Sequence, residues 1–218
     1  MTAPIGVAAI AAATVVATNL VDFELDTPRL ALLNANDQAS WSHIATAAAL
    51  AIAAVIAILT AMRPGHRRTL WGAVAGVQAL LCVVEISSVH VIVDRHSFGK
   101  LIYLPLLAAL VLCLWLLTSG SEQAQLVWAA ILVLMVAYVV HVFGARVVEA
   151  LGWGSGSWVY QVKVGIKEGA ELAGWLLLVV ALMRLARDGS ARSAGLDLRP
   201  GSRGKLARWA IGNRIRRG

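Results

Sequence analysis

The sequence predicts an all-α, polytopic transmembrane helix bundle of about six spans, with both termini in the cytoplasm. Hydrophobic residues make up 59% of the 218 residues, and only 14% are charged, whereas a soluble domain has about 25% charged residues. The mean hydropathy is +0.75. A soluble core of this size would not bury so much apolar sequence, so the composition indicates a membrane protein.

Six apolar runs are long enough to be transmembrane helices. No Lys or Arg precedes the first run, although a cleaved signal peptide normally begins with such residues, so this run is predicted to be a transmembrane helix. The predicted spans are residues 3–21, 42–62, 70–93, 101–118, 126–146 and 158–183.

The positive charges predict the orientation in the membrane. Ten of the 19 Lys and Arg residues lie from Arg184 onward, and Arg63, Arg67 and Arg68 lie in the short loop after the second span. Loops rich in Lys and Arg stay in the cytoplasm. Residues 1–184 are therefore predicted to form the helical bundle of a cell (inner) membrane protein, and 185–218 a basic, partly disordered cytoplasmic tail. The tail is expected to bind anionic lipid headgroups rather than nucleic acid.

The last predicted span, 158–183, contains charged residues that cannot face lipid. Each charge at the bilayer centre costs about 2.5–3.5 kcal/mol on insertion scales. On a helical wheel Lys163, Lys167 and Glu171 share one face, with Glu168 at its edge. Lys167 and Glu171 are four residues apart and are predicted to pair within the helix.

Small residues at a spacing of four occupy the opposite face of this span. They are Gly165, Gly169 and Ala173. Such spacing lets a second membrane helix approach closely, so this face is predicted to be a helix-packing surface. It is also the candidate contact of a possible homodimer.

Polar residues of other spans are expected to meet those of the last one. In the predicted topology nearly all of them lie in the outer half of the bilayer, and Glu85 lies well below the outer end of its helix. His43 and His96 are predicted to lie at headgroup level instead. The predicted polar cluster consists of Glu85, His141, Lys167, Glu168 and Glu171, followed by His90 and Lys163.

Three functions are compatible with this cluster, and the sequence does not decide whether the protein is an enzyme. In the first, ion pairs fix the helix packing of a structural protein that binds another membrane protein or a second copy. In the second, the cluster serves proton- or ion-linked transport or sensing. In the third, Glu85, His141 and Glu168 hold the metal of a membrane-embedded hydrolase.

The sequence has neither the HExxH metal-ligand pair that would support the third function nor a motif of another enzyme class. It contains no HExxH pair, phosphate-binding loop, GxSxG elbow or dinucleotide fingerprint. Cys82 and Cys113 lie inside apolar spans and form no disulfide framework. A haem between His90 and His141 has only those two histidines in its favour, so no cofactor or catalytic residue is named.

Two short segments resemble a group of small uncharacterised bacterial polytopic membrane proteins. That group has a helix of the type Glu-Glu-Ile-Ser-Trp-Gly-Gln and a Glu-rich last helix, which correspond here to Glu85-Ile86-Ser87 and to residues 167–172. Val84 replaces the first Glu, Ser88-Val89-His90 replaces Trp-Gly-Gln, and the downstream Asn/His signature is missing. The resemblance implies a bacterial inner membrane and transfers no functional residue.

Overall fold

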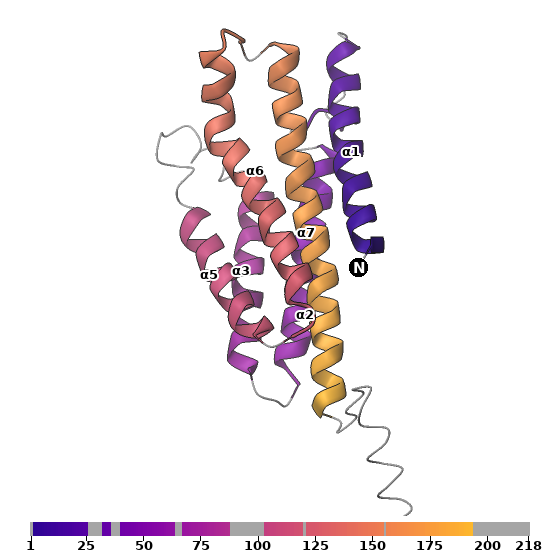
Figure 1. The fold of residues 1–218 in the computed structure, drawn as a ribbon, viewed down its shortest axis with the longest axis vertical. Helices are drawn as coiled ribbons and strands as arrows, with labels where there is room; N and C mark the ends of the chain where they lie inside the picture. The colour runs from indigo at the N-terminus through magenta and orange to yellow at the C-terminus, as the bar shows by residue number, and fades with distance from the viewer. Residues whose placement is uncertain are drawn as a thin grey trace, which may run out of the picture.

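The computed structural model describes residues 2–25, 32–35, 40–63, 67–87, 103–119, 121–154 and 156–193. All regular secondary structure in these residues is α-helical, which confirms the predicted all-α class. The described helices are α1 (Thr2–Glu24), α2 (Trp41–Ala61), α3 (Arg68–Ile86), α5 (Tyr103–Thr118), α6 (Ala124–Ala150) and α7 (Trp158–Ser193) (Figure 1).

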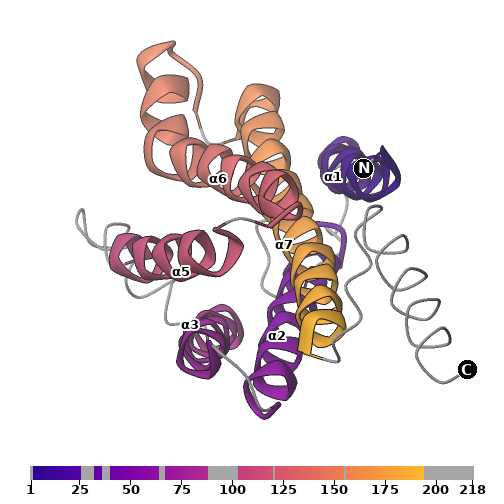
Figure 2. The same ribbon diagram turned by 60° about the horizontal axis from the view of Figure 1, so that its bottom comes forward.

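Helix α7 lies at the centre of the bundle and packs against α1, α2 and α6 (Figure 2). On the other side of α2, helix α3 follows, and α5 packs against α3. Leu178 and Leu182 of α7 are fully buried in the main hydrophobic core, together with Leu114 of α5 and Leu126 of α6. The predicted last span is therefore the element around which the other helices are arranged.

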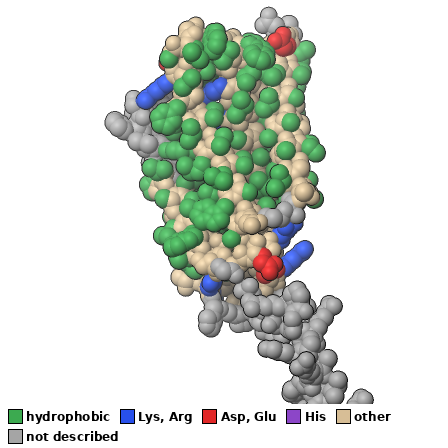
Figure 3. All heavy atoms as spheres, viewed as in Figure 1, with side chains coloured by type: hydrophobic (Ala, Val, Ile, Leu, Met, Phe, Trp, Pro, Cys, Tyr) green, Lys and Arg blue, Asp and Glu red, His purple; other side chains and the backbone are tan. Residues whose placement is uncertain are grey.

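Five of the helices are long and apolar enough to cross a membrane: α1, α2, α3, α6 and α7. Hydrophobic side chains cover most of the face seen in Figure 3, and the few charged side chains lie near its two ends. Helix α5 is apolar but has 16 residues, or about 24 Å at 1.5 Å per residue, against a hydrocarbon core of about 30 Å. The described residues thus have the helices of a multi-pass membrane protein.

The small-residue face of α7 is covered by α1 of the same chain. A Cβ atom placed on Gly165 would lie 3.1 Å from the Cα of Val16, and one placed on Gly169 would lie 2.8 Å from the carbonyl oxygen of Ala12. The side chain of Asn19 adds hydrogen bonds from α1 to Gln161 on α7. A second copy of the chain has no access to this face while α1 occupies it, contrary to the expectation of a homodimer contact there.

Two helix ends differ by more than one turn and a half from the predicted spans. Helix α3 ends at Ile86, with Ser87 as its C-cap, rather than at residue 93; residues 88–102 lie outside the described part. Helix α7 continues past residue 183 to Ser193. Gln123 at the start of α6 donates a hydrogen bond to Asp188 at 3.3 Å, which ties this extension to the bundle.

Candidate functional site

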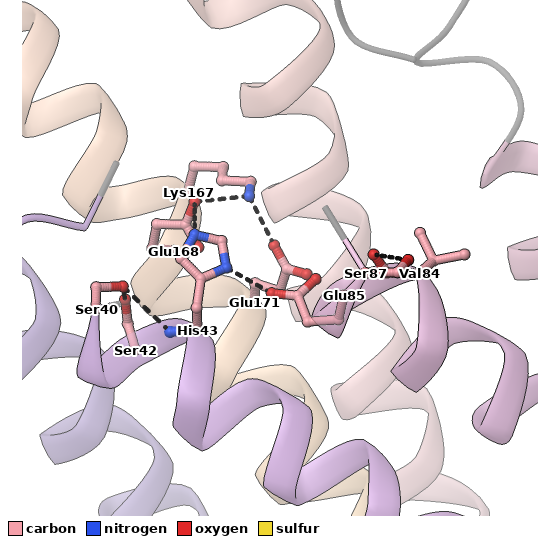
Figure 4. Close-up of polar contacts among 9 residues, drawn as sticks. All are labelled: Ser40, Ser42, His43, Val84, Glu85, Ser87, Lys167, Glu168 and Glu171. Atoms are coloured by element: carbon pink, nitrogen blue, oxygen red, sulfur yellow. Dashed lines mark hydrogen bonds and ion pairs between the residues drawn. The ribbon is translucent and has the colours of Figure 1, made fainter. Parts of the chain in front are cut away.

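A histidine in the first turn of α2 lies at the centre of the polar site. Ser40 caps this helix, and its hydroxyl accepts a hydrogen bond from the backbone N–H of His43 at 3.4 Å, as N-cap serines do. His43 Nδ1 lies 2.6 Å from Glu85 Oε1, and Nε2 lies 3.7 Å from Glu168 Oε1 (Figure 4). The imidazole therefore lies between carboxylates from two other helices.

His43 lies at the end of α2 where the sequence placed it, but its side chain points into the bundle. Its side chain is only 11% exposed, because α2 is antiparallel to α3 and the end of α3 brings Glu85 alongside. On a helical wheel His43 shares its face with Thr46 and Leu50, both of which are buried. That shared face is the sequence signal that pointed to an inward histidine.

Glu85 belongs to the site, but at a different depth from the one expected. It is the next-to-last residue of α3, so it lies at the end of its helix and not well below the end. One turn deeper, the thiol of Cys82 donates a hydrogen bond to the carbonyl of Ala47 at 3.5 Å. This contact and the His43–Glu85 pair hold α2 and α3 side by side.

Lys167 joins the two glutamates of α7. Its Nζ lies 2.7 Å from Glu168 Oε1 and 3.0 Å from Glu171 Oε2. Glu168 therefore contacts both Lys167 and His43, and connects the pair within α7 to the pair between α2 and α3 (Figure 4). We call His43, Glu85, Lys167, Glu168 and Glu171 the charged cluster.

The charges within the charged cluster do not cancel. It has three carboxylates and one ammonium, that of Lys167, which gives a formal charge of −2 when His43 is neutral and −1 when it is protonated. His141 of α6 lies near enough to Glu171 to interact with it electrostatically. A buried excess of negative charge favours the binding of a further proton or cation.

The contacts seen for Lys163 are with Tyr160 and with Gly144 of α6. The ammonium of Lys163 lies 5.0 Å from the ring centroid of Tyr160, within the range of a cation–π contact. Its aliphatic chain packs over Gly144 of α6, where an added Cβ would lie 3.0 Å from it. His90 lies outside the described residues.

The geometry does not assemble the metal site considered from the sequence. Within the described ranges, no three His, Cys, Asp or Glu side chains are placed to hold a metal ion. The predicted ligands Glu85, His141 and Glu168 thus do not form such a group, and the ammonium of Lys167 occupies the space between Glu168 and Glu171.

Comparison with known proteins adds no assignment. The sequence matches no protein-family model, no curated protein and no solved structure. The function is therefore inferred from the geometry of the charged cluster.

Proposed function

We propose that this chain is a multi-pass protein of the inner (cell) membrane whose charged cluster takes up and releases a proton in proton-linked transport or sensing. One observation carries the proposal: the His43 imidazole lies between the carboxylates of Glu85 and Glu168. Histidine is the side chain that ordinarily changes charge between about pH 5 and 8. Inside a membrane, such a group with carboxylate partners is typical of proton relays.

The charged groups that interact with His43 come from both helices packed against α2. Glu85 lies on α3, and Lys167, Glu168 and Glu171 lie on α7. Cys82 lies near Glu85, and His141 of α6 lies near Glu171. Only Lys167 is a fixed cation among them. A proton on His43 lowers the negative charge of the charged cluster, which is the reason for assigning the proton to this side chain.

The orientation in the membrane belongs to the same proposal. Arg63, Arg67, Arg68, Arg184 and Arg187 all lie at the end of the bundle where α2 ends, α3 begins and α7 ends (Figure 1). The positive-inside rule supports placing this end in the cytoplasm. Both termini are then cytoplasmic, α5 is the sixth span, the basic tail lies against anionic headgroups, and the charged cluster is nearer the outer surface.

Proton binding is tested first by titration of the purified chain in detergent. His43→Gln keeps a hydrogen-bonding side chain of similar size but removes the titrating group. We expect this variant to bind about one proton fewer per chain than the wild type between about pH 8 and 5. Thr60→Val is the matched control, because the Thr60 hydroxyl lies at the other end of α2 and donates to the carbonyl of Ile56 in its own helix. An equal proton count for His43→Gln and wild type would refute the proposal.

Proteoliposomes then separate transport from sensing. After an acid step outside vesicles that enclose a pH-sensitive dye, a transporter acidifies the interior faster than protein-free vesicles do. His43→Gln should abolish that difference, and Thr60→Val should keep it. A sensor binds the proton without acidifying the interior.

A structural role is the second candidate, and the contacts of Lys167 favour it. Its ammonium lies against Glu168 and Glu171 of its own helix, so part of the charge is balanced without any other element. In that role the pairs fix how α2 packs against α7 and α3, and His43→Gln lowers the melting temperature without changing the proton count.

A further inference from the structure

Three buried polar side chains lie deeper in the bundle than the charged cluster. They are Thr46 on α2, Gln78 on α3 and Trp175 on α7, with exposed fractions of 1%, 0% and 4%. The Thr46 hydroxyl, both polar atoms of the Gln78 amide and the Trp175 indole N–H have no hydrogen-bond partner among the described residues. Buried polar groups are nearly always hydrogen-bonded, so each of these calls for an explanation.

Each of the three residues lies on the same helix face as a member of the charged cluster. Thr46 follows His43 by three residues, Gln78 precedes Glu85 by seven, and Trp175 follows Glu171 by four. At about 1.5 Å per residue, Thr46 lies roughly 5 Å beyond His43 along its helix, and Gln78 roughly 10 Å beyond Glu85. The polar face of each of the three helices thus continues toward the centre of the bundle.

The register of the helices places Gln78 and Trp175 at about the depth of Leu50, roughly one turn below Thr46. The contact of Cys82 with Ala47 and the pair of His43 with Glu85 fix α3 against α2, and the His43–Glu168 pair fixes α7 against α2. Trp175 belongs to the same hydrophobic core as Leu50, Val74 and Leu178. The unpaired polar atoms therefore lie in the buried part of the bundle.

The chemistry of the unpaired atoms indicates that water is the molecule that bonds them. The indole N–H and the amide NH₂ are donors, the amide oxygen is an acceptor, and the hydroxyl is both. None of the three side chains is charged, and N–H donors repel a cation. Water donates and accepts hydrogen bonds, and buried water makes about three of them to groups that would otherwise be unsatisfied.

We propose that Thr46, Gln78 and Trp175 hold a short file of water molecules that continues the charged cluster into the centre of the bundle. Its role, which rests on the proposed function, is to pass protons between His43 and the cytoplasmic half of the membrane. The charged cluster is then connected to buried water molecules rather than to a core without water.

Removal of the polar atoms at constant size tests the water file. If no water bonded these atoms, Thr46→Val and Gln78→Met would each remove an unsatisfied polar group. Each would then raise the melting temperature by roughly 2–4 °C or more. With water present, each change instead removes a partner of that water and lowers the melting temperature. The double variant should then lose less than the sum of the two, because both changes affect one network. An unchanged or higher melting temperature, or strictly additive losses, would overturn the proposal.

A thiol probe gives a second measurement that does not depend on stability. In a Cys82→Ala/Cys113→Ala background, Gln78→Cys places a thiol at the water file, and Val74→Cys places one a turn deeper at a fully buried apolar site on the same face. Thiols react as thiolates, which need a polar environment. We expect Gln78→Cys to react with a small alkylthiosulfonate roughly tenfold faster than Val74→Cys; equal rates would contradict the water file.

The proton assays separate failure of this inference from failure of the proposed function. Gln78→Met should bind as many protons as the wild type but slow the acidification of proteoliposomes. Suppose that Gln78→Cys reacts faster than Val74→Cys while His43→Gln binds as many protons as the wild type. The water file is then supported, and the proton role of His43 is refuted. If His43→Gln loses a proton and the rates at positions 74 and 78 are equal, the opposite holds.

Discussion

Lys167 is the residue on which the charge balance of the site depends. It forms ion pairs with two carboxylates of α7, and its side chain is only 17% exposed. Removal of one partner of a buried ion pair leaves a charge without compensation and costs about 3–5 kcal/mol, whereas neutralising both partners costs much less. Lys167 and Glu171 should therefore behave as a coupled pair.

The predicted outcome is that Lys167→Gln or Glu171→Gln alone destabilises the protein more than the double change Lys167→Gln/Glu171→Gln. We expect the single Lys167→Gln variant to lose about 3 kcal/mol of unfolding free energy and the double variant to recover at least about 1 kcal/mol of it. Unfolding in mixed detergent micelles measures both. Glu149→Gln, at an exposed position near the end of α6, is the control and should change little. Additive losses would argue against the pairing.

At this scale, sequence reasoning found most of the charged cluster because charges in apolar helices need partners. Glu85, Lys167, Glu168 and Glu171 were expected together on that ground, and the structure brings them together. His43 was missed because a helical wheel orders residues within one helix and contains no information on which turns of two helices meet.

Between helices, α1 packs closely against α7, and the sequence predicted only one side of this contact. The spacing of Gly165 and Gly169 predicts that some helix approaches closely, but it does not say which one, and α1 takes the position expected for a second copy. The end of α3 was misplaced for a related reason. Apolar composition continues past Ile86, and hydropathy reports burial in lipid rather than helix termination.

Gly169→Ala should loosen the contact between α1 and α7. The new methyl group would lie 2.8 Å from the backbone oxygen of Ala12, and a backbone atom cannot rotate away as a side chain can. Overpacking of this kind costs about 1–3 kcal/mol, and the loss should appear as a lower melting temperature and faster proteolysis within α1.

Gly76→Ala on α3 is the matched control for this change. A Cβ there meets nothing within 4 Å, and alanine is favoured over glycine in a helix by about 0.5–1 kcal/mol. The control should therefore be neutral or stabilising. A Gly169→Ala variant as stable as the Gly76→Ala variant would show that α1 does not approach α7 this closely.

For the whole molecule, the membrane class follows from composition alone, because it needs only an average over the chain. The described helices agree with that class in length and composition, while orientation depends on the placement of a few charges. Arg67 illustrates the difference: its guanidinium donates to the carbonyls of Leu116 and Leu117 at 3.0 and 2.6 Å. It therefore stabilises the end of α5 as well as adding to the positive charge at that end.

Labelling of single cysteines in right-side-out membranes tests the orientation. In a background without Cys82 and Cys113, Trp153→Cys lies in the exposed turn between α6 and α7, and Ser119→Cys lies at the end of the bundle that contains Arg67. Because positively charged ends stay in the cytoplasm, Trp153→Cys should react with a bulky, impermeant maleimide in intact membranes. Ser119→Cys should react only after permeabilisation. The reverse pattern would place the charged cluster near the cytoplasmic surface, and the water file would then lead toward the outside.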